Sequence, residues 1–410
     1  MVDVSMNLIV LSHMYPSQGS IYGGAFVEKQ VIALRKIIDG EIFVISPIPW
    51  APRVLWFKKK WRDYGEEKKY LIRNNIKVYR PRYFRMPGRH YGLLEPFAMY
   101  MGIRTLVKHI ISTHNHNFIL HAHTVLPDGL TAVLLKKEFH LPVVCTAHGS
   151  DIYNYPFRSK LSYHQANTVL TKLDAIVTVS SKLKEIIFDI SSRRDGVYVV
   201  TNGVDSDWLA PREHAPLDSK IQRILFVGTL CPEKGVPELL KGFSLLSKEY
   251  NNIELVLVGR NNMKPWIDSF LSQNDLISRV NITGELSPDK LCEYYSNATI
   301  FTLPSHNEGM PTVMFEAMGS GLPVIISDVG GVSEVIKDNV NGLLTKPGNW
   351  QDLYLKLKLL LDSETLRDRL GAAAYKDVAM NYTWDINANK MMNIYRLLSQ
   401  RNSHMKSHIN

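Results

Sequence analysis

Two glutamates eight positions apart, Glu308 and Glu316, mark the segment of the chain best suited to chemistry. The segment lies between the apolar runs 300–303 and 323–326, so we predict a loop and a helix that join two strands. Pro311 suits the first turn of that helix, and the unpaired amides of the turn open onto the loop. A diphosphate would meet those amides and the positive end of the helix dipole, while both carboxylates accept hydrogen bonds from sugar hydroxyls.

His148 and Asp151 lie in another loop, which follows the apolar run Val143–Cys145. Ligands of open α/β sheets bind beyond the carboxyl ends of the strands, so both side chains stand where a reacting sugar and its acceptor could be reached. The alternative for the histidine is a satisfied polar group of the core.

Glycines and a lysine are the remaining candidates for binding phosphate. Gly23 and Gly24 precede a predicted helix, and paired glycines let the backbone approach a phosphate closely, although the same pair is a common turn signal. Lys234 follows the predicted strand 223–228 and would place an ammonium beside a diphosphate as the nucleotide leaves.

The histidines and cysteines do not indicate a metal site. His121 and His123 end a predicted strand, and we expect them to point to opposite sides, with no acidic partner at ligand spacing before Asp128. The cysteines have no Cys-x-x-Cys spacing, so we expect reduced thiols; they are Cys145, Cys231 and Cys292.

The 410 residues alternate apolar strand-like runs with helical stretches, which predicts an α/β fold with parallel sheets wrapped by helices. We predict a first domain over 1–205, a linker over 206–219, a second domain over 220–383, and a C-terminal helix and tail over 384–410 that packs back towards the first domain. Three closing helices should begin near 350, 364 and 384. No run approaches a membrane span and no signal peptide is evident, so we expect a cytoplasmic protein.

Most of the formal net charge of +9 arises between Trp50 and Lys108. Within this segment, residues 56–62 interleave aromatic and basic side chains, as in an interfacial segment that binds anionic lipid. A solvated basic loop with inward tryptophans is the alternative. We expect no nucleic-acid partner, because no nucleic-acid-binding motif accompanies the basic residues.

The segment Ser305–Gly319, with its two glutamates, resembles the Glu-x7-Glu signature of the retaining nucleotide-sugar glycosyltransferases of family four, and the resemblance extends from about Met6 to Leu398. It implies a GT-B fold, in which two Rossmann-like domains face each other across a cleft. The first domain would bind the acceptor and the second the nucleotide sugar. It also implies metal-independent catalysis without a cofactor.

The same resemblance assigns roles to residues of this chain. Glu308 would contact the hydroxyls of the donor sugar and Glu316 those of the ribose, while His148 faces the donor sugar and Asp151 the acceptor. The catalytic residues are predicted to be His148, Lys234 and Glu308. The donor-binding residues are predicted to be Gly23, Gly24, Thr229, Lys234, Glu308, Gly309, Met310, Pro311, Thr312 and Glu316.

Thr229 departs from the family pattern, which usually has arginine there, and Arg260 is the candidate substitute. A UDP-sugar is favoured as donor by family frequency alone. The basic aromatic segment favours a lipid-linked or glycan acceptor at the cytoplasmic membrane face. Three alternatives stay open: an inverting transferase with His13 as base, an epimerase or phosphorylase of the same fold, and a non-catalytic nucleotide-sugar-binding protein.

Overall fold

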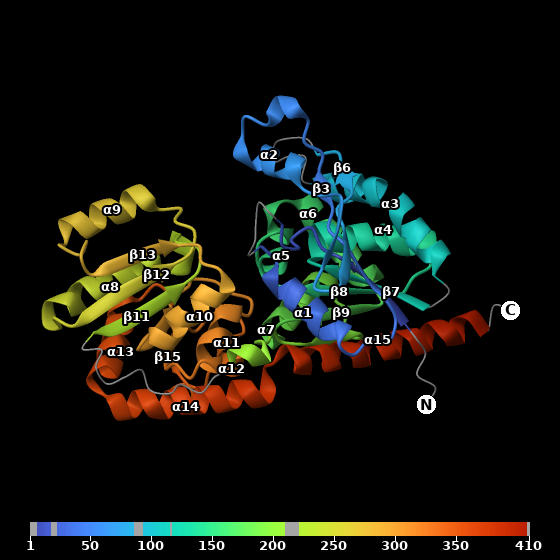
Figure 1. Cartoon of the computed structure of the whole chain (residues 1–410). Coiled ribbons are helices and arrows are strands. Elements are labelled where there is room, and N and C mark those ends of the chain that lie inside the picture. The colour runs from blue at the N-terminus through green and yellow to red at the C-terminus, as the bar shows by residue number, and fades with distance from the viewer. Residues whose placement is uncertain (1–5, 18–22, 86–92, 115–116, 210–220, 408–410) are drawn as a thin grey trace. The chain divides into compact units, whose positions relative to one another are not determined.

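The computed structural model describes residues 6–17, 23–85, 93–114, 117–209 and 221–407 (Figure 1). The chain divides into two compact units, one formed by residues 1–201 with 384–410 and the other by residues 202–383. Each is an α/β unit built on a largely parallel sheet. Among the described residues, no helix has both the length and the apolar character to cross a membrane.

The first unit is built on an eight-stranded sheet with the order β10-β9-β8-β7-β1-β2-β5-β4. Only β4 runs antiparallel, pairing with β5. The strands are β1 (Met6–Leu11), β2 (Ile42–Ile45), β4 (Tyr70–Arg73), β5 (Ile76–Tyr79), β7 (Asn117–His123), β8 (Val143–Ala147), β9 (Ala175–Thr178) and β10 (Val197–Val199). The helices are α1 (Ala25–Arg35), α3 (Glu95–Thr113), α4 (Leu130–Phe139), α5 (Ser150–Tyr153), α6 (Lys160–Lys172) and α7 (Ser181–Ser191). The central strands are buried along their whole length, as expected for a parallel sheet covered on both faces.

A small projection separates β2 from β4 in the sequence. It contains β3 (Ile48–Pro49), which pairs with β6 (Arg82–Tyr83), and the helix α2 (Lys59–Glu66). Figure 1 shows α2 at one end of the first unit, beyond β3 and β6. Because β3 follows the last residue of β2 after only two positions, the projection leaves the sheet at its carboxyl edge.

The C-terminal helix α15 (Trp384–Ser407) belongs to the first unit and lies along α1 (Figure 1). Its apolar side enters the core through Trp384, Met391 and Tyr395. A buried hydrogen bond joins Gln30 Nε2 to Asn387 Oδ1 at 2.7 Å, and Asn387 in turn donates to the carbonyl of Thr201. These contacts fix the helix to the first sheet.

The second unit has a six-stranded parallel sheet with the order β13-β12-β11-β14-β15-β16. The strands are β11 (Gln222–Val227), β12 (Ile253–Val258), β13 (Val280–Gly284), β14 (Ile300–Leu303), β15 (Val324–Ser327) and β16 (Leu343–Thr345). The helices are α8 (Val236–Glu249), α9 (Lys264–Gln273), α10 (Pro288–Asn297), α11 (Thr312–Gly319), α12 (Val332–Val335), α13 (Trp350–Asp362) and α14 (Glu364–Asn381). The predicted starts of the three closing helices are confirmed at Trp350, Glu364 and Trp384.

The boundary between the units differs from the predicted one at residue 205. Val204 forms a backbone bridge with Thr383, and Asn202 donates to the carbonyl of Met310, so residues 202–205 belong to the second unit. The start of the predicted linker, Ser206–Trp208, is a 3₁₀ helix of the same unit. The rest of that linker, 210–219, lies outside the described residues.

Candidate functional site

Glu308 lies in the loop between β14 and α11, and two side chains hold its carboxylate. Its Oε1 accepts hydrogen bonds from Lys234 Nζ at 2.5 Å and from the hydroxyl of Ser305 at 2.7 Å. Ser305 is fully buried, and the Lys234 and Glu308 side chains are 30% and 10% exposed. The lysine and the glutamate, 74 positions apart, are therefore brought together as a half-buried ion pair.

Two glycines let neighbouring loops approach this glutamate. Gly235, which follows Lys234, has φ +70°, and a Cβ there would lie 1.9 Å from the carbonyl oxygen of Pro304. Gly330 has φ +57°, and its Cβ would lie 1.8 Å from the carbonyl oxygen of Glu308. Gly331 donates its N–H to the carbonyl of Gly309. The backbone packing around Glu308 thus requires glycine at both positions of positive φ.

The amino end of α11 follows the Glu308 loop in the chain. Pro311 was predicted in the first turn of the helix, but it lies one position earlier, as the N-cap residue with an extended backbone, and the helix begins at Thr312. The first amides of a helix have no intrahelical acceptor, so those of Thr312 and Val313 are suited to bind an anion. The side chain of Asn202 donates to the carbonyl of Met310, which fixes the loop just before the helix.

Glu316 lies one turn further along α11. Its Oε2 accepts a hydrogen bond from the hydroxyl of Tyr295 at 3.0 Å. Glu316 as a residue is half-buried. The loop after β14 thus carries one glutamate and α11 the other.

Thr229, the departure from the family pattern, is half-buried in the loop after β11. The neighbouring Leu230 donates its N–H to the carbonyl of Arg260, so the backbones of the two loops lie side by side. The exposed guanidinium of Arg260 lies 3.2 Å from Glu285. Whether Arg260 compensates for Thr229 stays a prediction.

In the first unit, the structure brings the Gly23–Gly24 loop and the His148 loop together. The ring of Phe26, at the start of α1, packs on the ring of His148 with centroids 4.4 Å apart. Gly24 has φ +68°, and a Cβ there would lie 2.0 Å from the carbonyl oxygen of Met14. The local backbone thus requires Gly24 whether or not it also contacts phosphate.

Three histidines stack in the interior beside this contact. His148 Nε2 lies 3.1 Å from His123 Nδ1, and the rings of His123 and His121 are 4.3 Å apart. The ring nitrogens of His121 are hydrogen-bonded to two hydroxyls, Nδ1 to that of Tyr395 and Nε2 to that of Thr146, each at 2.7 Å. Burial lowers the pKa of His121 and of His148 to about 3, so both rings are neutral at physiological pH.

The expectation that His121 and His123 point to opposite sides was wrong. Residues i and i+2 of a strand lie on the same face of the sheet, so the regular strand β7 stacks the two rings. Among the described residues, no group of three or more His, Cys, Asp or Glu side chains has an arrangement that could hold a metal ion.

Asp151 is buried and holds the turn that carries His148. Its Oδ1 accepts the backbone N–H groups of His148 and Gly149, and its Oδ2 accepts that of Val125. Burial raises the pKa of the Asp151 carboxyl, and these amide donors act in the opposite direction. A contact of Asp151 with an acceptor stays a prediction.

His13 and Asp128 form a hydrogen-bonded pair at the carboxyl edge of the first sheet. The Nδ1 atom of His13 lies 2.7 Å from the Oδ2 atom of Asp128, which is fully buried, whereas the His13 side chain is 32% exposed. Burial lowers the pKa of His13, but the charge and hydrogen bond of Asp128 outweigh it, and the net pKa is raised. With Nδ1 engaged, Nε2 is the nitrogen suited to interact with a hydroxyl.

Comparison with known proteins identifies the family. The model of Glycosyltransferase Family 4 matches residues 50–208, and that of Glycosyl transferases group 1 matches residues 211–377. TuaC of Bacillus subtilis, a glycosyltransferase whose name places it in teichuronic acid biosynthesis, is 30% identical over 411 residues, 96% of this chain and 99% of the relative. The chain belongs to glycosyltransferase family 4.

Solved structures agree with the GT-B fold of this glycosyltransferase. Sucrose-phosphate synthase from Thermosynechococcus elongatus matches with a TM-score of 0.80 at 18% identity, covering 97% of this chain and 100% of that chain. HepE from Anabaena, in complex with UDP-glucose, matches with a TM-score of 0.70 at 16% identity, covering 96% and 99%. At these identities the likeness concerns the fold.

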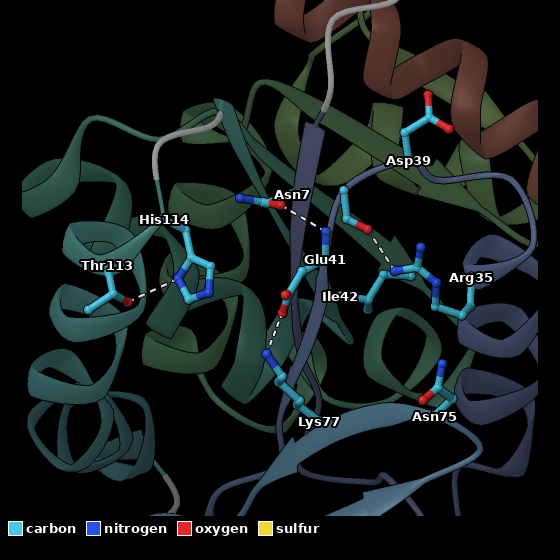
Figure 2. Close-up of a pocket in the computed structure, with 10 residues that line it drawn as sticks. Asn7, Arg35, Asp39, Glu41, Ile42, Asn75, Lys77, Thr113 and His114 are labelled. Atoms are coloured by element: carbon cyan, nitrogen blue, oxygen red, sulfur yellow. Dashed lines mark hydrogen bonds and ion pairs between the residues drawn. The ribbon is translucent and has the colours of Figure 1, made fainter.

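A pocket of about 600 Å³ in the first unit is unrelated to the candidate residues (Figure 2). Its lining includes Asn7, Glu41 and Lys77, which lie at the amino ends of β1, β2 and β5. Figure 2 shows Glu41 directed at Lys77 and the Asn7 side chain directed at the backbone of Glu41. The candidate side chains of the glycosyltransferase lie instead at the carboxyl edges of the two sheets, where parallel sheets bind ligands.

Sequence reasoning missed the partners that hold the candidate side chains. Asp128 follows a strand end, which is a weak signal, but nothing in the sequence pairs it with His13, 115 positions away. Ser305 lies inside the glutamate motif and was not assigned a role. Tyr295 and Tyr395 occupy ordinary apolar positions of helices and had no signal.

Proposed function

We propose that this glycosyltransferase moves a sugar from a UDP-sugar to a hydroxyl of a lipid-linked or glycan acceptor, with retention of the anomeric configuration and without a metal. The observation that carries the proposal is the cluster of Lys234, Glu308 and Ser305 beside the amino end of α11. A cation and a row of helix amides would bind the diphosphate, and a fixed carboxylate would bind sugar hydroxyls.

In this mechanism, the bond between the anomeric carbon and the phosphate oxygen breaks while the acceptor oxygen approaches on the same face. The departing phosphate takes the acceptor proton. Lys234 and the amides of Thr312 and Val313 stabilise the negative charge that develops on the phosphate. Glu308 and His148 would orient the sugar, and Glu316 the ribose. The neutral His148 ring can do so only through hydrogen bonding, because its pKa is lowered to about 3 by burial.

Two similarities support the choice of substrates. HepE, which has the same fold, is known in complex with UDP-glucose, and this favours a uridine nucleotide. TuaC is named for teichuronic acid biosynthesis, and this favours an acceptor in the synthesis of cell-envelope polysaccharide or glycolipid.

Thermal unfolding of the purified protein with UDP, GDP, ADP and the corresponding sugar nucleotides, in the presence of EDTA, tests the donor site. A ligand that binds only the folded state raises the melting temperature, and we expect the uridine series to do so. A shift with GDP or ADP alone would replace the uridine assignment. A shift that appears only when excess Mg²⁺ replaces EDTA would refute metal independence.

We further propose that the projection around α2 binds the anionic cytoplasmic face of a membrane. The indole N–H of Trp56 donates to the carbonyl of Ala51, and Trp56 is half-buried, whereas Phe57 is 77% exposed and is followed by the exposed lysines 58–60. Apolar and cationic side chains therefore project together, as membrane-surface segments do.

Sedimentation with vesicles of phosphatidylglycerol and of phosphatidylcholine tests this surface. We expect salt-sensitive binding to the anionic vesicles that is lost when the three lysines become glutamate. The same change at Lys248, Lys290 and Lys337, three exposed lysines of the second unit, alters the net charge equally and is the matched control. Equal sedimentation of the triple variant and the native protein would remove the proposal.

The pair of His13 and Asp128 favours a second candidate, an inverting reaction with His13 as general base. A carboxylate on Nδ1 leaves Nε2 to accept a proton, as in other His–Asp catalytic pairs. The NMR coupling constant of the anomeric proton in the product distinguishes the two reactions. Retention supports the first candidate, and inversion supports the second.

A further inference from the structure

We infer that Tyr295 positions Glu316 for the nucleotide ribose and thereby sets the preference of the donor site for ribonucleotides. The inference rests on the proposed function, in which Glu316 binds the ribose hydroxyls. Tyr295 lies on α10, 21 positions before Glu316, and its hydroxyl donates to Glu316 Oε2 at 3.0 Å. The backbone carbonyl of Val313 lies 3.4 Å from the same hydroxyl.

The Tyr295 ring is suited to hold its hydroxyl in one place. It is fully buried, and it packs against Trp208 and Phe301 with centroids 5.6 Å and 5.9 Å apart. Burial, followed by the charge and hydrogen bond of Glu316, raises the pKa of Tyr295 well above its ordinary value. The phenol therefore stays protonated and acts as the donor towards the carboxylate.

A hydrogen bond to Oε2 restricts the rotation of the Glu316 carboxylate before any ligand arrives. A carboxylate that binds two vicinal hydroxyls must present its remaining lone pairs in a fixed plane, and ordering it in advance lowers the entropic cost of binding. Glu308 is held in a comparable way by the buried hydroxyl of Ser305. Each glutamate thus has its own hydroxyl donor, so the two can be tested separately.

Calorimetric binding of UDP and of 2′,3′-dideoxy-UDP tests the role of Tyr295. The two ligands differ only in the hydroxyls that Glu316 would bind. We expect Tyr295→Phe to weaken UDP binding about 3- to 10-fold, less than the loss of a direct hydrogen bond to a charged group, because Tyr295 orders Glu316 and does not contact the ligand. Binding of dideoxy-UDP should change less than about twofold. Phenylalanine retains the packing against Trp208 and Phe301.

Tyr294→Phe is the matched control, because it removes a tyrosine hydroxyl from the adjacent position of the same helix. We expect it to leave both affinities unchanged. Glu316→Ala should abolish the preference for UDP over dideoxy-UDP. In the Glu316→Ala background, Tyr295→Phe should have no further effect on UDP binding.

Two results would overturn the inference while leaving the proposed function in place: an unchanged UDP affinity in Tyr295→Phe, or an equal loss for both ligands, which would indicate general loosening of the helix. Failure of the native protein to bind UDP, GDP or ADP would refute the proposed function and the inference together. If GDP or ADP binds instead, the same comparison with its dideoxy form decides the role of Tyr295.

Discussion

Replacement of Lys234 by alanine separates a catalytic role from a structural one. In the structure, its ammonium pairs with Glu308, and the two side chains are 30% and 10% exposed. A pair of this intermediate burial contributes about 1 kcal/mol to stability, more than a typical surface pair and less than a fully buried one. For a unit of this size, that corresponds to a fall in the melting temperature of about 2–4 °C.

The expected effect on catalysis is much larger. Removing one preorganised donor to a developing negative charge costs about 10²–10³-fold in kcat. Lys234→Ala should therefore lose about 100-fold or more of its turnover while the protein remains folded at the assay temperature. The assay is the initial rate of UDP release at saturating donor, with melting curves of the same preparations.

Lys264→Ala is the control, because Lys264 and its partner Asp268 are 73% and 52% exposed in the same unit. It should change neither turnover nor the melting temperature measurably. If Lys234→Ala turns over as fast as the native protein at saturating donor, Lys234 does not stabilise the leaving phosphate. A loss confined to donor affinity would likewise refute the reasoning, because the lysine would then act equally in the ground state and the transition state.

Three further results are expected. Glu316→Ala should weaken donor binding more than it lowers kcat; a selective loss of kcat would contradict its assignment to the ribose. The NMR titration of His13 should give a pKa above 6.5, and Asp128→Asn should lower that pKa. Because the pKa of His13 is raised on folding, the stability that His13 contributes is present below pH 6.5 and is lost as the pH rises through the folded pKa. His121 shows the opposite sign, since its pKa falls from 6.5 to about 3, so acidification from pH 7 to pH 5 should cost about 2 kcal/mol of unfolding free energy. In urea unfolding, this acidification should lower the unfolding free energy of His121→Gln less than that of the native protein or of the exposed control His140→Asn. Equal losses in all three proteins would refute the lowered pKa of His121.

The order of strands and helices could be predicted because buried parallel strands are continuous apolar runs. The apolar run 300–303 is β14 with these bounds, and the predicted strand 223–228 is β11, which spans Gln222–Val227. Strands β3, β4, β6 and β16 were not predicted; β3 and β6 have only two residues each, which carry no periodicity. The position of the glutamate loop also followed from the sequence, since it lies between two such runs.

The contacts that hold the site could not be predicted, because they join residues far apart in the chain. Tyr395 and His121 are 274 positions apart, and Lys234 and Glu308 are 74 apart. Such pairs depend on strand order and on the path of α15, neither of which local pattern determines. The error in the predicted orientation of His121 and His123 has a different origin. The two-residue period of a strand was sufficient to predict that both rings lie on one face of the sheet.

The charges around the proposed donor site indicate where the remaining neutralisation of a diphosphate would come from. Lys234 already compensates Glu308, so it cannot by itself balance the added phosphates. Thr229 contributes a hydroxyl without charge, and the guanidinium of Arg260 is paired with Glu285. Under the proposed function, the amides at the amino end of α11 would then carry a large share of the binding, and α11 begins at Thr312, directly after the loop that carries Glu308. Such a dependence would account for a loop that is held by a buried serine, a lysine and glycines of positive φ, since a displacement of the loop would move the helix amides and the Glu308 carboxylate together.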